Sequence, residues 1–165
     1  MKKIIVLICI LVGIGSYSQT AEETRFLEQA EAAMNDDSYT TFLDEVIKFR
    51  SSENSLYELY YNNSFLDKIG SVENSRNTCS LNDNDFKKWV TKNLNQTKFS
   101  SVEEAIDLFN GQKKYARLNE TKNKEINLKL QEYKEKYGLL LHNEFMHALV
   151  QVEKNAYNKI LKQES

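Results

Sequence analysis

The chain has 165 residues, a formal net charge of −2, five glycines and no proline. A net negative charge does not neutralise phosphate groups, so the composition argues against general nucleic-acid binding. Since few residues break helices, long helices are expected.

The N-terminus has the three-part layout of a secretory signal peptide. Residues 1–3 are short and basic, residues 4–15 form an apolar stretch, and residues 16–18 include small side chains. A membrane-spanning helix needs about 20 apolar residues, and this stretch is shorter. We therefore predict a signal peptide at residues 1–18, cleaved before Gln19, and export to the periplasm or the cell exterior. No membrane span is expected after cleavage.

Cleavage would leave residues 19–165, which carry 20 basic and 24 acidic residues. This length suits one helical domain with a single core. Cys79 is the sole cysteine of this part of the chain. We expect it to be buried, because unpaired cysteine is among the most buried residue types. A disulfide-linked dimer through Cys79 is the alternative.

Three helices are predicted in the first half of the mature chain. Thr20 and Glu23 form a capping box, which opens a helix that ends near residue 35. Apolar residues at helical spacing then predict a second helix over residues 38–50 and a third over residues 55–69.

A loop and a fourth helix are expected next. Gly70 stands where a left-handed residue would end the third helix. Residues 71–83 lack apolar periodicity and are rich in Ser, Asn and Asp, so they are predicted to form the longest loop. Asp83 or Asp85 is expected to cap the fourth helix.

The remaining chain is helical in pattern. Ser101 and Glu104 form a second capping box, and Gly111 is expected to end the helix that they open. Residues 112–162 keep an apolar stripe that stays nearly in phase across Gly138, which favours one long, bent helix over a tight turn. The predicted fold is all-α, a bundle of five or six helices with a long C-terminal helix.

A metal site is one hypothesis for the C-terminal segment. His142 and His147 are five residues apart, about 140° around a helix, so they do not readily bind one ion together. Glu144 and His147 share a face and match half of the di-metal site of four-helix bundles. The second Glu-x-x-His of such a site is missing from the sequence. The alternative function is accordingly an enzyme that depends on a metal at Glu144 and His147, or on the thiol of Cys79.

The charges are unevenly spread along the chain. Residues 19–75 carry four basic and twelve acidic side chains, whereas residues 76–165 carry sixteen basic and twelve acidic ones. We favour mutual attraction of the two halves within the fold over an acidic surface that faces a basic partner. If the second holds, the candidate binding residues are Asp36, Asp37, Asp44 and Glu45.

Tyr57, Tyr60 and Tyr61 form a second candidate binding surface, because tyrosine is enriched at the centres of protein interfaces. Aromatic residues at helical spacing are also typical of the rim of a core. The sequence holds no serine-hydrolase elbow and no phosphate-binding glycine loop. The main hypothesis is therefore an exported, non-enzymatic protein that binds a protein partner without a cofactor, for example an inhibitor or an immunity-type protein.

Overall fold

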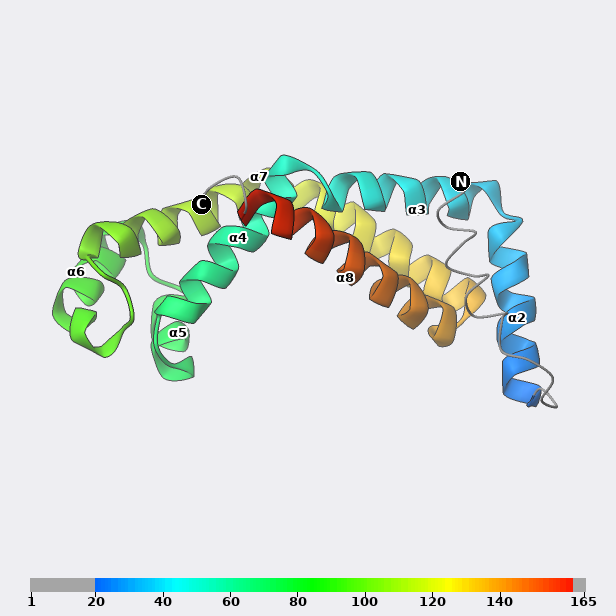
Figure 1. Ribbon diagram of the computed structural model, residues 1–165, viewed down its shortest axis with the longest axis horizontal. Coiled ribbons are helices and arrows are strands. Elements are labelled where there is room, and N and C mark those ends of the chain that lie inside the picture. The colour runs from blue at the N-terminus through cyan, green and yellow to red at the C-terminus, as the bar shows by residue number, and fades with distance from the viewer. Residues whose placement is uncertain (1–19, 162–165) are drawn as a thin grey trace.

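The computed structural model describes residues 20–161, and all regular structure in this range is helical (Figure 1). Its elements are α2 (Ala21–Met34), α3 (Asp37–Arg50), α4 (Glu53–Lys68), α5 (Val72–Thr78), α6 (Asp83–Asn93), the 3-10 turn η1 (Leu94–Gln96), α7 (Val102–Tyr137) and α8 (Leu139–Leu161). The all-α prediction and the long C-terminal helix are confirmed, but the described residues hold seven α-helices instead of five or six. The predicted signal peptide, residues 1–18, lies outside the described residues.

The 36-residue helix α7 connects the two ends of an elongated, arched molecule (Figure 1). At 1.5 Å per residue it is about 54 Å long. Helices α4, α5 and α6 surround its N-terminal end, whereas α2, α3 and α8 lie at its C-terminal end. Helix α8 turns back and runs antiparallel to α7 towards the middle of the arch.

Each end of α7 contributes to a separate group of buried side chains. We call the group at the N-terminal end the phenylalanine core; it contains Phe65, Ile69, Phe86, Val90, Phe99, Ala105, Leu108 and Phe109. We call the other the tyrosine core; it contains Ala30, Ala33, Tyr39, Phe42, Leu43, Val46, Ile126, Leu130, Tyr137, Leu141 and Leu149. The single core expected from the chain length is therefore divided in two.

Local signals placed several helix ends correctly. The Thr20 side chain accepts a hydrogen bond from the Glu23 backbone and the Glu23 side chain accepts one from the Thr20 backbone, as a capping box requires. Ser101 likewise accepts from the Glu104 backbone at the start of α7. Gly70 has a φ of 93° after α4, as expected.

The loop predicted over residues 71–83 is wrong, because α5 occupies its first half. This short helix is held by polar contacts rather than by the packing of an apolar face. The Ser71 side chain caps it, and the Asn74 side-chain amide donates hydrogen bonds to the carbonyl oxygens of Ile69 and Gln96. The expected burial of Cys79 is also wrong, since this residue is exposed just after the helix.

The cap predicted for the fourth helix is wrong, because neither Asp83 nor Asp85 is its N-cap. Asn82 is the N-cap of α6 and accepts a hydrogen bond from the backbone of Asp85. Asp83 and Asp85 instead lie in the first turn, where their negative charge interacts favourably with the positive end of the helix dipole.

Two glycines of the C-terminal half behave opposite to expectation. Gly111 does not end a helix, because α7 continues through it. Gly138 does, and its φ of 96° lets the chain reverse within one residue, so residues 112–162 are not one helix. The apolar stripe stays in phase because Leu130 of α7 and Leu141 of α8 contribute to the same core.

Candidate binding cleft

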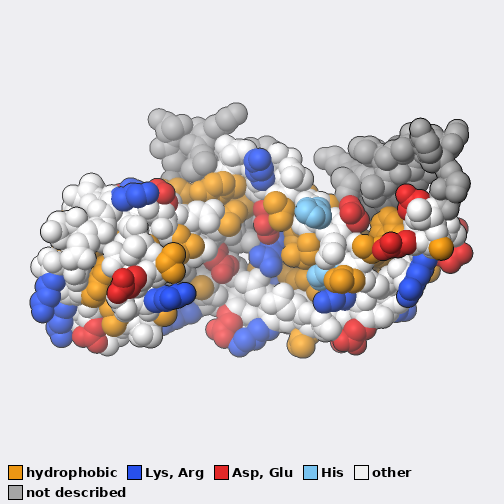
Figure 2. Space-filling view, turned by 90° about the horizontal axis from the view of Figure 1, so that it is seen from below, with side chains coloured by type: hydrophobic (Ala, Val, Ile, Leu, Met, Phe, Trp, Pro, Cys, Tyr) orange, Lys and Arg blue, Asp and Glu red, His pale blue; other side chains and the backbone are white. Residues whose placement is uncertain are grey.

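The middle of the arch carries a cleft of about 290 Å³. Figure 2 shows the molecule hollowed between its two ends, with acidic and basic side chains beside the hollow. The volume is close to the lower limit of about 300 Å³ for ligand pockets. The cleft is lined by Arg50 of α3, by Ser55, Leu56, Glu58, Leu59 and Asn62 of α4, by Gln112 and Ala116 of α7, and by Glu153 of α8.

The fold positions this cleft where four helices meet. Helix α3 ends at Arg50 and α4 begins only three residues later, so the turn between them brings both helices to the cleft. Helix α4 then packs on α7 and also contacts α8. The cleft thus lies between the phenylalanine core and the tyrosine core, beside the α4–α7 contact.

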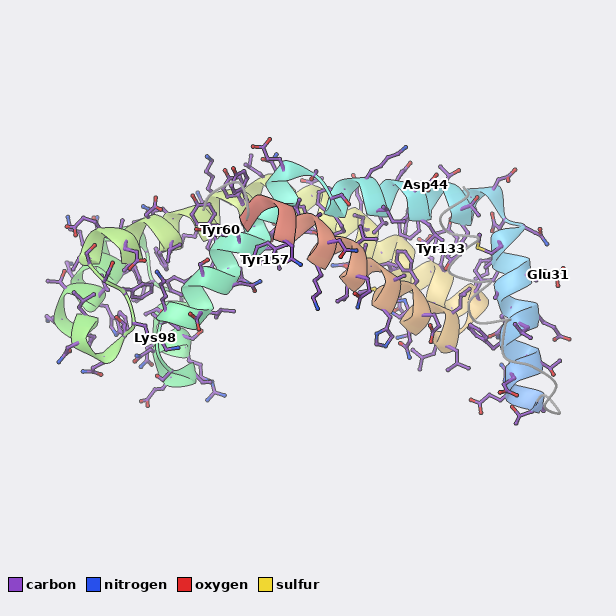
Figure 3. All side chains as sticks on the ribbon, in the orientation of Figure 1. Glu31, Asp44, Tyr60, Lys98, Tyr133 and Tyr157 are labelled. Atoms are coloured by element: carbon purple, nitrogen blue, oxygen red, sulfur yellow. The ribbon has the colours of Figure 1, made fainter. Side chains whose placement is uncertain are left out.

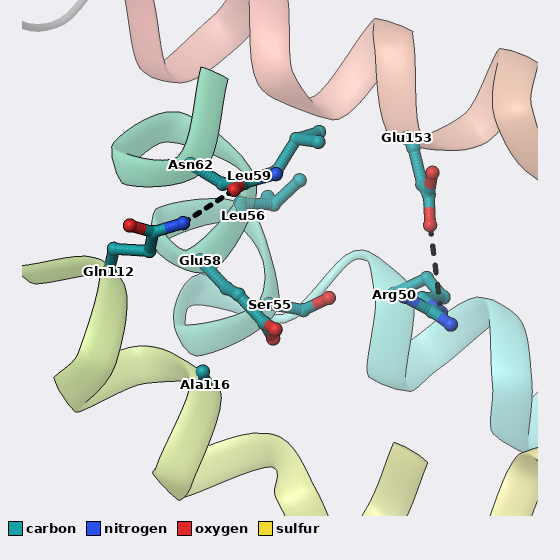
Figure 4. Close-up of a pocket in the computed structure, with 9 residues that line it drawn as sticks. All are labelled: Arg50, Ser55, Leu56, Glu58, Leu59, Asn62, Gln112, Ala116 and Glu153. Atoms are coloured by element: carbon teal, nitrogen blue, oxygen red, sulfur yellow. Dashed lines mark hydrogen bonds and ion pairs between the residues drawn. The ribbon is translucent and has the colours of Figure 1, made fainter. Parts of the chain in front are cut away.

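One wall of the cleft is formed by amide hydrogen bonds. Gln112 Nε2 donates to Asn62 Oδ1 at 2.8 Å across the α4–α7 contact (Figure 4). The buried Asn119 donates from Nδ2 to Glu58 Oε2 at 2.7 Å and to the Asn54 carbonyl oxygen at 3.1 Å. These bonds fix the direction of Glu58, because its carboxylate is held by a buried side chain.

The opposite wall carries an ion pair. Arg50 Nε lies 3.6 Å from Glu153 Oε1, and the two side chains are 27% and 23% exposed (Figure 4). Arg50 Nε is buried and makes no hydrogen bond to the part of the chain that the structure describes. Burial raises the pKa of Glu153, and the Arg50 guanidinium opposes this effect without cancelling it.

The tyrosines singled out in the sequence join α4 to α7. Tyr57 and Tyr61 stack on Tyr115, with ring centroids 5.2 and 5.5 Å apart, and all three are half-buried. A side chain at Gly111 would overlap the Tyr61 ring, so this glycine allows the close approach. These tyrosines therefore serve the α4–α7 contact, and their role in binding stays a prediction.

Tyr60 has different surroundings. Its ring meets Tyr61 edge-on at 5.3 Å, and in Figure 3 it lies beside Tyr157 of α8. Both Tyr60 and Tyr157 are half-buried, and each is within about one helical turn of a residue that lines the cleft. Burial raises the pKa of Tyr157. Neither ring lines the cleft itself.

Asp36 is occupied by the fold itself. Its carboxylate caps α3 and accepts hydrogen bonds from Lys136 Nζ at 2.7 Å and from the Tyr137 hydroxyl at 2.6 Å. The contact with Lys136 is the main reason why the pKa of Asp36 lies well below its usual range. Asp36 therefore connects α3 to the end of α7.

The other acidic candidates are more accessible. Asp37 is exposed and Asp44 is half-buried, while Glu45 Oε2 lies 3.8 Å from Lys122 Nζ. Three ion pairs join an acidic residue of the first half to a lysine of the second: Asp36 with Lys136, Glu45 with Lys122 and Asp67 with Lys98. Two others, Arg50 with Glu153 and Lys68 with Glu104, have the opposite polarity. An acidic docking surface stays a prediction.

Glu144 and His147 are both exposed on α8. Over residues 20–161, no three or more His, Cys, Asp or Glu side chains gather in a way that could hold a metal ion. The paired residues therefore gain no further ligand from the described fold, and the metal site stays a prediction. His142 is half-buried, and burial lowers its pKa. None of the described helices is both long and apolar enough to cross a membrane.

The sequence did not point to the residues of the cleft. Asn62 and Gln112 are 50 residues apart, and Arg50 and Glu153 are about twice as far apart. One local signal concerns Glu153. It follows Val152 of the C-terminal apolar stripe, so its carboxylate lies close to the apolar face of that helix. No family model, curated protein or solved structure was found to match this chain, so the cleft is interpreted from its own geometry.

Proposed function

We propose that this chain is an exported, non-enzymatic binding protein whose central cleft receives a group from a protein partner. The observation that carries the proposal is the cleft itself, which combines apolar and polar lining residues at the meeting point of four helices. Such a combination is typical of sites that bind and orient a group. The signal-like sequence of residues 1–18 supports export.

The residues that line the cleft favour binding over catalysis. They include Ser55 but neither a histidine nor a cysteine, so the cleft offers no pair of nucleophile and imidazole base. Its charged groups already have partners, Glu58 with Asn119 and Glu153 with Arg50. Fixed, partnered charges provide specificity for an incoming group, because that group must match their positions.

The surroundings of the cleft favour a protein as the partner. Tyr60 and Tyr157 lie beside one another, each within about one helical turn of a residue that lines the cleft, and tyrosine contributes strongly at interfaces because it combines a large apolar ring with a hydroxyl. The molecule is hollowed between its two ends, and a convex surface fits against such a hollow (Figure 2). A side chain of the partner would enter the cleft while its surface contacts Tyr60 and Tyr157.

Capture of partners by cleft variants tests this proposal. Tagged protein of residues 19–165 is incubated with an envelope extract, and the bound proteins are identified by mass spectrometry. Ala116→Met fills the cleft from an exposed helical position, and methionine suits a helix. Leu118→Met, at an exposed position that does not line the cleft, is the matched control.

The expected result is one saturable partner that the wild type and Leu118→Met retain and Ala116→Met loses. Circular dichroism of each variant verifies that it is folded. Equal capture by Ala116→Met, or no captured protein with folded wild type, would contradict a binding role for the cleft.

A further inference from the structure

More acidic than basic side chains line the cleft. Glu58 and Glu153 are acidic, whereas Arg50 is the sole basic residue among the nine that line it. The Arg50 guanidinium is next to Glu153, so the carboxylate of Glu58 has no basic partner of its own within the cleft. An anionic group would meet an excess of negative charge. A group with one positive charge would balance the cleft.

The apolar lining of the cleft limits the kind of cation that fits. Leu56, Leu59 and Ala116 are apolar and provide no ligands for a metal ion. Over residues 20–161, no three or more His, Cys, Asp or Glu side chains gather in a way that could hold a metal ion, and the cleft itself has two carboxylates, those of Glu58 and Glu153. An organic cation instead places its hydrocarbon part on the leucines, where apolar contact is favourable.

Burial makes an added positive charge favourable at Glu153. This carboxylate is half-buried, and Arg50 does not fully compensate the loss of water, so the pKa of Glu153 remains raised. The 3.6 Å separation is longer than a hydrogen bond, which leaves the carboxylate able to accept one from another donor. An ammonium group has three such donors.

We propose that the cleft binds an alkylammonium group, with its aliphatic chain against Leu56, Leu59 and Ala116 and its ammonium directed to Glu58 and Glu153. This inference rests on the proposed function and specifies the group that the cleft receives. Two sources supply this chemistry, a lysine side chain of a protein partner and a free aliphatic amine. Neither source requires a covalent step.

Binding of a small lysine analogue tests the inference directly. Nα-acetyl-lysine N-methylamide is titrated into the protein of residues 19–165, and the methyl NMR signals of Leu59 and Ala116 are followed. The norleucine analogue, which lacks the ammonium, is the neutral control. We expect the lysine analogue to bind at least about tenfold more tightly, because a charged hydrogen bond contributes more than a neutral contact.

Variants of the two carboxylates identify the charge that matters. Glu58→Gln keeps an oxygen that accepts the Asn119 hydrogen bond, so the α4–α7 contact is retained. We expect Glu58→Gln and Glu153→Gln each to weaken binding of the lysine analogue by about tenfold. Glu132→Gln, at an exposed position on α7, should bind as the wild type does. Equal binding of the norleucine analogue, unchanged binding by both glutamine variants, or no shift of the cleft methyl signals would each overturn the inference.

Cadaverine separates the two sources. Tighter binding of cadaverine than of the lysine analogue supports a free amine, whereas tighter binding of the lysine analogue, which alone carries peptide groups, supports a side chain of a partner. The partner-capture experiment fails or succeeds independently of these titrations. If Ala116→Met loses the partner while the lysine analogue does not bind, the binding function stands and the alkylammonium inference is wrong.

Discussion

The phenylalanine core and the tyrosine core differ in how far apart their residues lie in the sequence. The phenylalanine core is built from residues 65–109, which follow one another closely. The tyrosine core joins residues 30–46 to residues 126–149, so it requires the two ends of the described chain to meet. Contacts between distant residues close large loops and form slowly. The comparison indicates that the first core forms locally, whereas the second depends on the α7–α8 hairpin.

The two cores also differ in chemistry. Phe86 and Phe109 stack with centroids 3.9 Å apart, and the phenylalanine core consists of apolar side chains alone. The tyrosine core contains hydroxyl groups. The ring centroid of Tyr39 lies 5.0 Å from that of Tyr133 and 5.4 Å from that of Tyr137. Burial raises the pKa of Tyr39 to about 12. Buried hydroxyls need hydrogen-bond partners, so this core also depends on polar groups at its edge.

The largest expected effect comes from opening the phenylalanine core. Phe86 is fully buried, and Phe86→Ala removes its ring from contact with Phe109 and Phe65. We expect the free energy of unfolding to fall by about 3–5 kcal/mol, because the lost apolar burial adds to the cost of the cavity. Chemical denaturation followed by circular dichroism measures this loss.

The matched control is Phe26→Ala, at a half-buried position beside the tyrosine core. Its loss should be smaller, since its ring is already partly in water. A loss below about 1 kcal/mol for Phe86→Ala would show that this core can collapse around the cavity.

A smaller effect is expected at the joint between the cores. Gly111→Ala places a methyl group where the Tyr61 ring lies, and the ring must move. Overpacking costs about 1–3 kcal/mol, while alanine in a helix gains about 1 kcal/mol over glycine. We therefore expect a net loss of stability of up to about 2 kcal/mol, measured by thermal or chemical unfolding.

The double-mutant cycle with Tyr61→Ala separates the two contributions. Without the ring, Gly111→Ala should stabilise the protein, because the gain in helix propensity remains alone. If Gly111→Ala has the same effect with and without Tyr61, the two residues are not coupled and the close contact is unimportant.

Local rules predicted the helix ends that local contacts determine. Thr20, Ser101 and Gly70 act through residues only a few positions away, and each lies where the pattern placed it. Helix α5 does not follow from local rules, because Asn74 holds it to Gln96, which is 22 residues away. The place of Gly111 inside a helix is likewise not local, since the residue that it accommodates is Tyr61 of another helix.

The candidate site was less predictable than the fold. Its ion pair and its amide pair join residues from helices far apart in sequence, and no spacing rule connects them. The acidic character of residues 19–75 is visible in the sequence, but Asp36 in that half accepts hydrogen bonds from Lys136 and Tyr137 and so connects two helices of the fold. A single charged residue in a sequence does not reveal whether it faces solvent or the other half of its own chain.

The smallest and most specific test concerns pH. The folded-state pKa of Asp36 is depressed, so its charge stabilises the fold above the unfolded value of about 3.9, and this stabilisation is lost as pH falls towards the folded pKa. Asp36→Asn keeps a good N-cap residue but removes the charge that attracts Lys136. The variant should therefore be less stable than the wild type above about pH 4, and the difference should shrink at lower pH.

Urea unfolding at a series of pH values shows whether this effect is confined to one core or reaches both. The amide NMR signals of Leu141 and Val90 report on the two cores. Leu141 belongs to the tyrosine core, which Asp36 joins through Tyr137, and Val90 to the phenylalanine core. If the two cores unfold separately, Asp36→Asn shifts the Leu141 transition and leaves that of Val90 in place. Asp37→Asn, at an exposed neighbouring position, should shift neither. Coincident shifts of both signals would instead mean that α7 couples the two cores into one cooperative unit, because a change at one end would then be felt equally at the other.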